Sequence, residues 1–160
     1  MRSARDWLLG GVILLLAGFM AASGCSGGES AGGDGHEHGV MTTEGEWHET
    51  TSGPDELPSF LLRYADRTVD LYAVVYEHMD ILRQLNCYCG CMDANDPHDS
   101  LLRCFLVDVQ DDGSITWTDH GANCGICLME LQDAVAFAKQ GKSADEIRGL
   151  IDAKYAPADL

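Results

Sequence analysis

The chain has 160 residues, with 10 basic and 26 acidic side chains and a formal net charge of −16 at pH 7. A surface this acidic repels phosphate backbones, which excludes nucleic acid as a partner. Once an N-terminal targeting segment is set aside, this length leaves room for one small domain around a single core.

Residues 1–24 have the parts of an export signal. Arg2 and Arg5 provide a positive start, residues 7–22 are mostly apolar, and small residues close the run. Glycines interrupt the apolar run, which favours cleavage over a permanent transmembrane helix. The closing sequence ASGC resembles the bacterial lipobox, so we expect Cys25 to carry a lipid; an ordinary secretory peptide is the alternative. The prediction is an extracytoplasmic lipoprotein, anchored to the membrane through Cys25.

Residues 25–54 are rich in Gly, Ser, Thr, Glu and His and contain few apolar side chains. Such a segment cannot bury enough surface to offset its conformational entropy, which predicts a disordered tether. A coil of about 30 residues would hold the folded domain, residues 55–160, roughly 30 Å from the membrane. His36, His38 and Met41 are candidates for a weak copper or zinc capture site on the tether, although short histidine tracts in linkers are often inert.

The first half of the folded domain has apolar residues at helical spacing. Residues 57–64 predict a short helix. Thr68 then offers an N-cap for a longer helix that should run to about Leu85. This helix leads into NCYCGCMDANDPH, residues 86–98, a segment rich in turn-forming residues.

The second half begins with a change of pattern. Two short strands around a Gly-containing turn are expected at residues 104–107 and 115–118. A helix should then begin near Asn123 and end before Gly141. Ser143, with a glutamate three residues on, forms a capping box that opens a last helix. The predicted fold is mainly α with a short β-hairpin, a small α+β domain.

Six cysteines fall within this domain. They are Cys87, Cys89, Cys91, Cys104, Cys124 and Cys127. In an oxidising compartment they would by default form three disulfides, whose pairing cannot be read from the sequence. The first three alternate with single residues, so a disulfide among them would close a small, strained ring. Each therefore needs a distant partner, and three thiolates on one flexible turn also suit a soft metal.

The last two cysteines form a CxxC pair near a predicted helix N-terminus. That position should lower the thiol pKa values of Cys124 and Cys127, which supplies two more sulfur ligands or a thioredoxin-type redox pair. No second thioredoxin feature, such as a βαβ run, accompanies the pair. His98 and His120 flank the cysteine segments and are further ligand candidates, because H-x3-C-x2-C is a spacing that metal sites tolerate.

Three methionines also lie near the cysteines in sequence, namely Met79, Met92 and Met129. They offer thioether ligands, although methionine on a helical stripe more often fills the core.

Four stretches of the folded domain resemble a known family. They are NCYCGC at 86–91, CF at 104–105, HGANCGICL at 120–128 and GKSADEIRGLIDAKY at 141–155. Together they resemble the bacterial lipoprotein family named for a PCYCGC motif, with Asn86 where the name calls for proline. The resemblance implies the lipoprotein placement and the grouping of these cysteines, and it implies no activity.

Other chemistries lack their motifs. Covalent c-type haem is excluded because Leu128 follows Cys127 where CxxCH needs a histidine. Assembly of an iron–sulfur cluster after export is awkward. The segment 102–104 is similar to the LRCxxC of haem-maturation thiol reductases, but Val107 replaces the second cysteine. No phosphate-binding loop or catalytic triad pattern is present in the sequence.

The sequence therefore predicts a non-enzymatic lipoprotein that binds soft metal, with copper(I) favoured and zinc as the alternative. The expected ligands are Cys87, Cys89, Cys91, Cys104, Cys124, Cys127, His98 and His120. Storage, detoxification or delivery to a cuproprotein or metal transporter would suit such a site. The alternatives are a thiol–disulfide redox protein that uses the CxxC pair and a disulfide-stapled interaction module.

Overall fold

The computed structural model describes residues 39–93 and 98–158. The expected export signal, the lipid site at Cys25, and the tether histidines lie outside the described residues. Among the residues that are described, no helix is both long enough and apolar enough to cross a bilayer.

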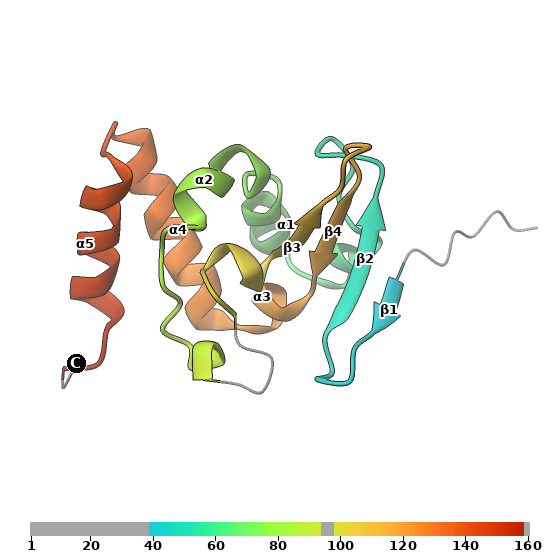
Figure 1. The fold of residues 1–160 in the computed structure, drawn as a ribbon, viewed down its shortest axis with the longest axis horizontal. Coiled ribbons are helices and arrows are strands. Elements are labelled where there is room, and N and C mark those ends of the chain that lie inside the picture. Colours follow the sequence, from blue (N-terminus) through green and yellow to red (C-terminus); the bar gives the residue numbers. More distant parts are fainter. Residues whose placement is uncertain (1–38, 94–97, 159–160) are drawn as a thin grey trace, which may run out of the picture. The chain divides into compact units, whose positions relative to one another are not determined.

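Four antiparallel strands form one sheet in the order β1-β2-β4-β3 (Figure 1). They are β1 (Gly39–Met41), β2 (Trp47–Thr51), β3 (Leu106–Val109) and β4 (Ile115–Thr118). The predicted hairpin is confirmed as β3 and β4. Its turn contains Gly113 at φ 88°, a left-handed conformation that glycine adopts without steric cost.

Strands β1 and β2 lie within residues 25–54, which we expected to be disordered, so the folded part begins earlier than residue 55. The strand β2 lacks an apolar pattern because its buried side chains are polar. Thr51 accepts a hydrogen bond from the Trp117 indole at 2.9 Å, and the Glu49 carboxylate accepts one from the Phe60 backbone N–H at 3.2 Å. Such bonds satisfy the buried polar groups. An argument from composition counts polar residues against folding because it does not include their hydrogen-bond partners.

The helix expected from Thr68 to Leu85 is broken into three pieces. They follow the short 3-10 helix η1 (Ser59–Arg63) and are α1 (Asp66–Tyr72), η2 (Tyr76–His78) and α2 (Met79–Leu82). Between α1 and η2 the backbone bonds tighten to i+3 spacing, as from the Val74 N–H to the Leu71 carbonyl. Two adjacent β-branched residues, Val74 and Val75, weaken the α-helix here.

The C-terminal helices agree with the sequence pattern. They are α3 (His120–Asn123), α4 (Gly125–Lys139) and α5 (Ala144–Tyr155), and α4 and α5 pack side by side (Figure 1). Gly141, at φ 78°, follows α4 as predicted. The capping box of Ser143 and Glu146 opens α5, and both of its reciprocal hydrogen bonds are formed. The small α+β fold class is confirmed.

The aromatic core ties the sheet to the short helix that carries a candidate ligand. The Tyr72 ring packs edge-on against Phe105, with centroids 5.3 Å apart. Its hydroxyl donates to the Thr118 carbonyl at 2.7 Å and accepts from the Ala122 N–H at 3.0 Å. Because these two groups flank His120, Tyr72 fixes where α3 begins.

Candidate metal centre

The turn that contains Cys87, Cys89 and Cys91 presents its sulfurs to different neighbours. Gly90 lies between the last two cysteines at φ 91°, a conformation that other residues rarely adopt. A Cβ placed there would meet nothing within 4 Å, so the requirement for glycine is conformational. Cys87 and Cys91 are buried, while Cys89 is half-buried.

Helix α4 holds this turn through a buried carboxylate. Glu130 is fully buried, and its Oε1 accepts a hydrogen bond from the Tyr88 N–H at 2.8 Å. Its Oε2 has no hydrogen-bond partner among the described residues. Burial first, and then the neighbouring Cys87, raise the pKa of Glu130 to about 9, so this side chain is neutral near pH 7.

The sulfurs of the turn meet cysteines from two other segments. Cys87 Sγ lies 3.5 Å from the sulfur of Cys127, which projects from the first turn of α4. Cys91 Sγ lies 3.7 Å from the sulfur of Cys104, which ends the 3-10 helix η4 (Leu102–Cys104). Each of these two cysteines thus has a cysteine from a distant segment beside it, and all four are free thiols in the structure.

Four of the sulfurs are close enough to share one ion. The ligand atoms of Cys87, Cys89, Cys104 and Cys127 all lie within 4.8 Å of one another. Sulfurs bound tetrahedrally at about 2.3 Å from a zinc ion are roughly 3.8 Å apart, so a small contraction would complete such a site. Two further sulfur-containing groups meet the same 4.8 Å limit: Cys89, Cys91, Cys104 and His120, and Cys89, His120, Cys124 and Cys127. A group without sulfur, Glu46, His98 and His120, also meets it.

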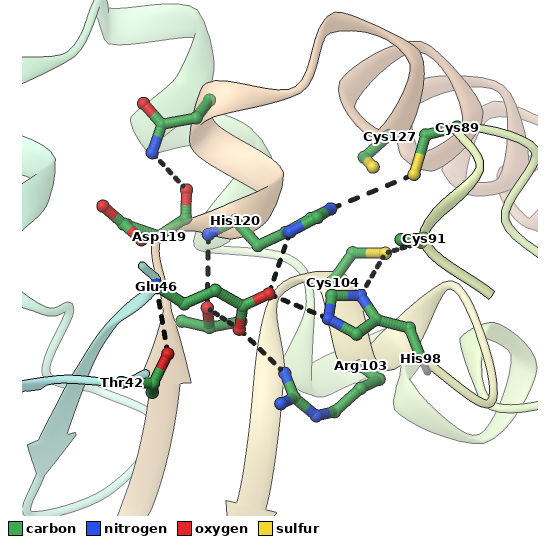
Figure 2. A network of polar contacts seen from close by, with 12 residues as sticks. Thr42, Glu46, Cys89, Cys91, His98, Arg103, Cys104, Asp119, His120 and Cys127 are labelled. Carbon is green, nitrogen blue, oxygen red and sulfur yellow. Dashed lines mark hydrogen bonds and ion pairs between the residues drawn. The ribbon is translucent and has the colours of Figure 1, made fainter. Parts of the chain in front are cut away.

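Both candidate histidines lie between the sulfurs and one carboxylate (Figure 2). His98 has Nδ1 at 3.3 Å from Cys104 Sγ and Nε2 at 2.9 Å from Glu46 Oε1. His120 has Nε2 at 3.9 Å from Cys89 Sγ and Nδ1 at 2.9 Å from the same Glu46 oxygen. The other oxygen, Glu46 Oε2, contacts three more side chains: His48, Arg103 and Thr118.

Glu46 sets the orientation of the two imidazoles. A carboxylate only accepts hydrogen bonds, so the ring nitrogen that faces Glu46 carries the hydrogen. In the neutral ring the other nitrogen then presents its lone pair to the sulfurs. Metal-binding histidines in general have this arrangement, with a carboxylate behind the ring that fixes the tautomer.

Electrostatics around Glu46 reinforce this orientation. Burial would raise the pKa of the Glu46 carboxyl, but hydrogen bonds from His120, His98 and His48 outweigh it and hold the pKa well below its usual range. The Glu46 hydrogen bond, opposed by burial and aided by Cys89, raises the pKa of His120 to about 9. His120 is therefore protonated in the metal-free protein near pH 7, and it would release a proton on binding a metal.

The thiols fall into two classes. Hydrogen bonds with Cys104 and Cys127 lower the pKa of Cys87 despite its burial, and the hydrogen bond with Cys104 likewise lowers that of Cys89. For Cys127, the bond with Cys104 would lower the pKa, but the bond with Cys87 and burial outweigh it and raise the pKa. The lowered pKa expected for Cys127 at the helix N-terminus is therefore not found, because the hydrogen bond with Cys87 and then burial both raise it.

The structure brings all eight sequence-predicted ligands into one region, although not into one coordination sphere. His98 contacts Cys104 but belongs to none of the three sulfur-containing groups. Met79 and Met92 are partly buried against the core, while Met129 on α4 is 43% exposed.

Sequence reasoning missed two acidic residues of the site, Glu46 and Glu130. Glu46 stands among other glutamates in a polar segment, and its contact with His120 spans more than seventy positions of the chain. Glu130 was detectable in principle, since it interrupts the apolar stripe of α4 one position before Leu131. A charged residue on a core-facing stripe indicates a buried partner.

Gly121 allows α3 to approach η4 closely. A Cβ at this position would lie 2.3 Å from the Phe105 ring and 2.7 Å from the Cys104 carbonyl oxygen, which real structures do not tolerate. Both neighbours are held by the core, so an added methyl group must displace α3. Such a displacement would move His120 away from the sulfurs.

Gly121→Ala is therefore expected to lower the free energy of unfolding by about 1–3 kcal/mol, the usual cost of overpacking. Urea unfolding of the metal-free protein measures this change. The matched control is Gly149→Ala in α5, where a Cβ meets nothing within 4 Å. That helix position should gain roughly 0.5–1 kcal/mol. Equal stability of the two variants would contradict the close-approach explanation.

Fold and site together define a small cysteine-rich α+β domain in which candidate sulfur and imidazole ligands converge from three segments. Residues 12–158 match the family described as a protein of unknown function with PCYCGC motif, and the chain belongs to this family. The resemblance to the PCYCGC family, which rested on four motifs of the sequence, is thus confirmed. No curated protein and no solved structure matches the chain.

Proposed function

We propose that this protein binds soft metal outside the cytoplasm, with copper(I) as its principal ion. One observation carries the proposal: Cys87, Cys89, Cys104 and Cys127 come from three segments, and their sulfurs lie within 4.8 Å of one another. Two of these cysteines, Cys104 and Cys127, are fully buried. Buried thiolates that crowd each other require a cation or protons between them.

The ligand types favour copper(I) over zinc. Copper(I) prefers two or three soft ligands and shares thiolates between ions, whereas zinc closes a single tetrahedral site. The three overlapping groups all contain Cys89, so several alternative ligand sets surround the same space. That redundancy suits a metal with low and variable coordination number.

One edge of the site is accessible for metal exchange. Cys89 and Cys124 are half-buried, and 24% of the His120 side chain is exposed, while Cys87, Cys104 and Cys127 are buried. An incoming soft ligand from a partner would therefore reach the ion beside Cys89. This edge supports metal delivery to a cuproprotein or a metal transporter, in addition to storage or detoxification.

The expected anchor at Cys25 extends the proposal to location. A lipid there would hold the site at the outer face of a membrane. The protein acts in this view as a binding protein and catalyses no reaction.

Competition for copper(I) tests the proposal. Full-length protein in detergent is reduced, freed of metal, and mixed without oxygen with copper(I) held by a colorimetric chelator. Withdrawal of copper from the chelator, and displacement of bound zinc by copper, are the expected results. If the chelator keeps all of its copper, the proposal is wrong.

A specific observation also favours the disulfide alternative. The sulfurs of Cys87 and Cys127 are 3.5 Å apart, and those of Cys91 and Cys104 are 3.7 Å apart, so small movements would allow either bond. Cys89 and Cys124, whose sulfurs lie within 4.8 Å, would form the third pair. This alternative therefore predicts one particular pairing.

Insulin reduction separates the other alternative, a redox protein that uses the Cys124–Cys127 pair, from metal binding. The proposal predicts no turnover, because Cys127 belongs to the four-sulfur group, and a thiolate held by a metal ion is not free to form a disulfide with Cys124. Activity that Cys124→Ser abolishes would support a thiol–disulfide oxidoreductase instead.

A further inference from the structure

Two of the candidate ligand groups share residues, and together they offer more ligands than one ion would bind. Cys87, Cys89, Cys104 and Cys127 form one group, and Cys89, Cys91, Cys104 and His120 form another. Cys89 and Cys104 belong to both. We infer that the site binds a pair of soft-metal ions, with the sulfurs of Cys89 and Cys104 bridging them; this inference rests on the proposed function.

The two shared residues have the surroundings that bridging sulfurs need. Cys104 is fully buried, and its Sγ contacts both Cys91 Sγ at 3.7 Å and His98 Nδ1 at 3.3 Å. Cys89 stands opposite, with His120 Nε2 3.9 Å from its sulfur. Each sulfur thus has a partner from the second group while remaining within 4.8 Å of the first.

The non-shared ligands divide into two unlike sets. Cys87 and Cys127, 3.5 Å apart, complete an all-sulfur set for one ion. Cys91 and His120 complete a mixed sulfur and nitrogen set for the other. No non-bridging ligand has to serve both ions, and each ion receives four candidate donors at most, which suits copper(I) or zinc.

Charge also favours two ions. Five thiols, those of Cys87, Cys89, Cys91, Cys104 and Cys127, lie in the two groups, and each releases a proton when it binds metal. One monovalent ion would leave most of this buried negative charge uncompensated, at a high desolvation cost. A second cation offsets more of the charge, and a bridging thiolate interacts with both cations at once.

Glu46 stabilises the mixed sulfur and nitrogen set through its hydrogen bond with His120. Its Oε1 holds His120 Nδ1 at 2.9 Å, so Nε2 faces the sulfurs and offers its lone pair to an ion there once its proton is released. Because the first group offers only sulfur and the second also offers an imidazole, the two ions should differ in their spectroscopic signatures and in affinity.

Metal counting on the full-length protein tests the inference. Reduced, metal-free protein in detergent is titrated with copper(I) without oxygen, and native mass spectrometry counts the bound ions. The expected result is two copper ions, with a copper–copper scattering peak in X-ray absorption. A single bound ion, or two ions without that peak, overturns the inference and leaves the proposed function standing. No bound ion overturns both.

Three serine variants locate the bridges, and near-ultraviolet circular dichroism confirms their folding. Cys91→Ser should reduce the count from two ions to one. Cys89→Ser should lower the affinity for both ions by at least about 10-fold, since even residues that only orient a ligand contribute that much to metal affinity. Ile126→Ser is the matched control, because this exposed side chain beside the site offers no ligand atom, and the variant should retain two ions. Loss of only one ion in Cys89→Ser contradicts bridging by Cys89.

Discussion

Cys104→Ser is expected to lower the copper(I) affinity of the protein by more than about 100-fold, because residues that merely orient a ligand already contribute 10–100-fold. Cys104 is fully buried, and it belongs to two of the three sulfur-containing groups. A serine hydroxyl is a hard donor and a poor ligand for copper(I). Chelator competition with the reduced protein measures the loss.

The substitution should disturb the metal-free fold much less. A buried hydroxyl without a partner costs about 1–3 kcal/mol, but His98 Nδ1, now 3.3 Å from the sulfur, offers an acceptor. Urea unfolding should therefore show a change at the lower end of that range. Ile126→Ser, an exposed position on α4 beside the site that offers no ligand atom, is the control and should keep its affinity. Equal losses in the two variants would refute the central place given to Cys104.

Glu46→Gln is expected to weaken both the fold and the site. The carboxylate accepts hydrogen bonds from both candidate histidines through Oε1, and from Thr118 and Arg103 through Oε2. A glutamine would place its amide NH2 group, a donor, against other donors, either the two histidines or Thr118 and Arg103. It would also remove the negative charge. We expect a loss of about 2–3 kcal/mol in the metal-free protein, below the full value for a buried ion pair because 13% of the Glu46 side chain is exposed.

The same change should reduce metal affinity by about 10–100-fold, the range for residues behind histidine ligands. Nuclear magnetic resonance of the imidazoles supplies an independent readout, because the His120 pKa, raised to about 9 in the native protein, should fall toward its ordinary value. Glu44→Gln, two residues away on the exposed part of the same hairpin, is the matched control. A variant that keeps native affinity and an unchanged His120 pKa would show that Glu46 does not orient the site.

Local rules account for what the sequence predicted well. The capping box at Ser143 and the turn glycine at 113 act within a few residues, so their patterns are legible without tertiary information. Chain geometry alone showed that a disulfide among Cys87, Cys89 and Cys91 would be strained. For Cys87 and Cys91, the structure then supplies the distant partners that this argument required.

Contacts between remote segments account for what the sequence did not predict. Strand β2 is folded because its polar side chains find partners far along the chain, as Thr51 does with Trp117. The expected helix beyond Thr68 breaks because two valines and the packing of Tyr72 outweigh a good apolar stripe. Glu46 joins the site through a tertiary contact, which no local spacing encodes.

The mass of the protein isolated from its own membrane, recorded in native and in denaturing conditions without added reductant, tests soft-metal binding most directly. The account predicts the mass of bound copper in the native spectrum, and its loss with all six domain cysteines still carrying hydrogen after denaturation. A protein without metal, with the loss of one hydrogen from each of those cysteines, would contradict the account and identify the domain as disulfide-stapled.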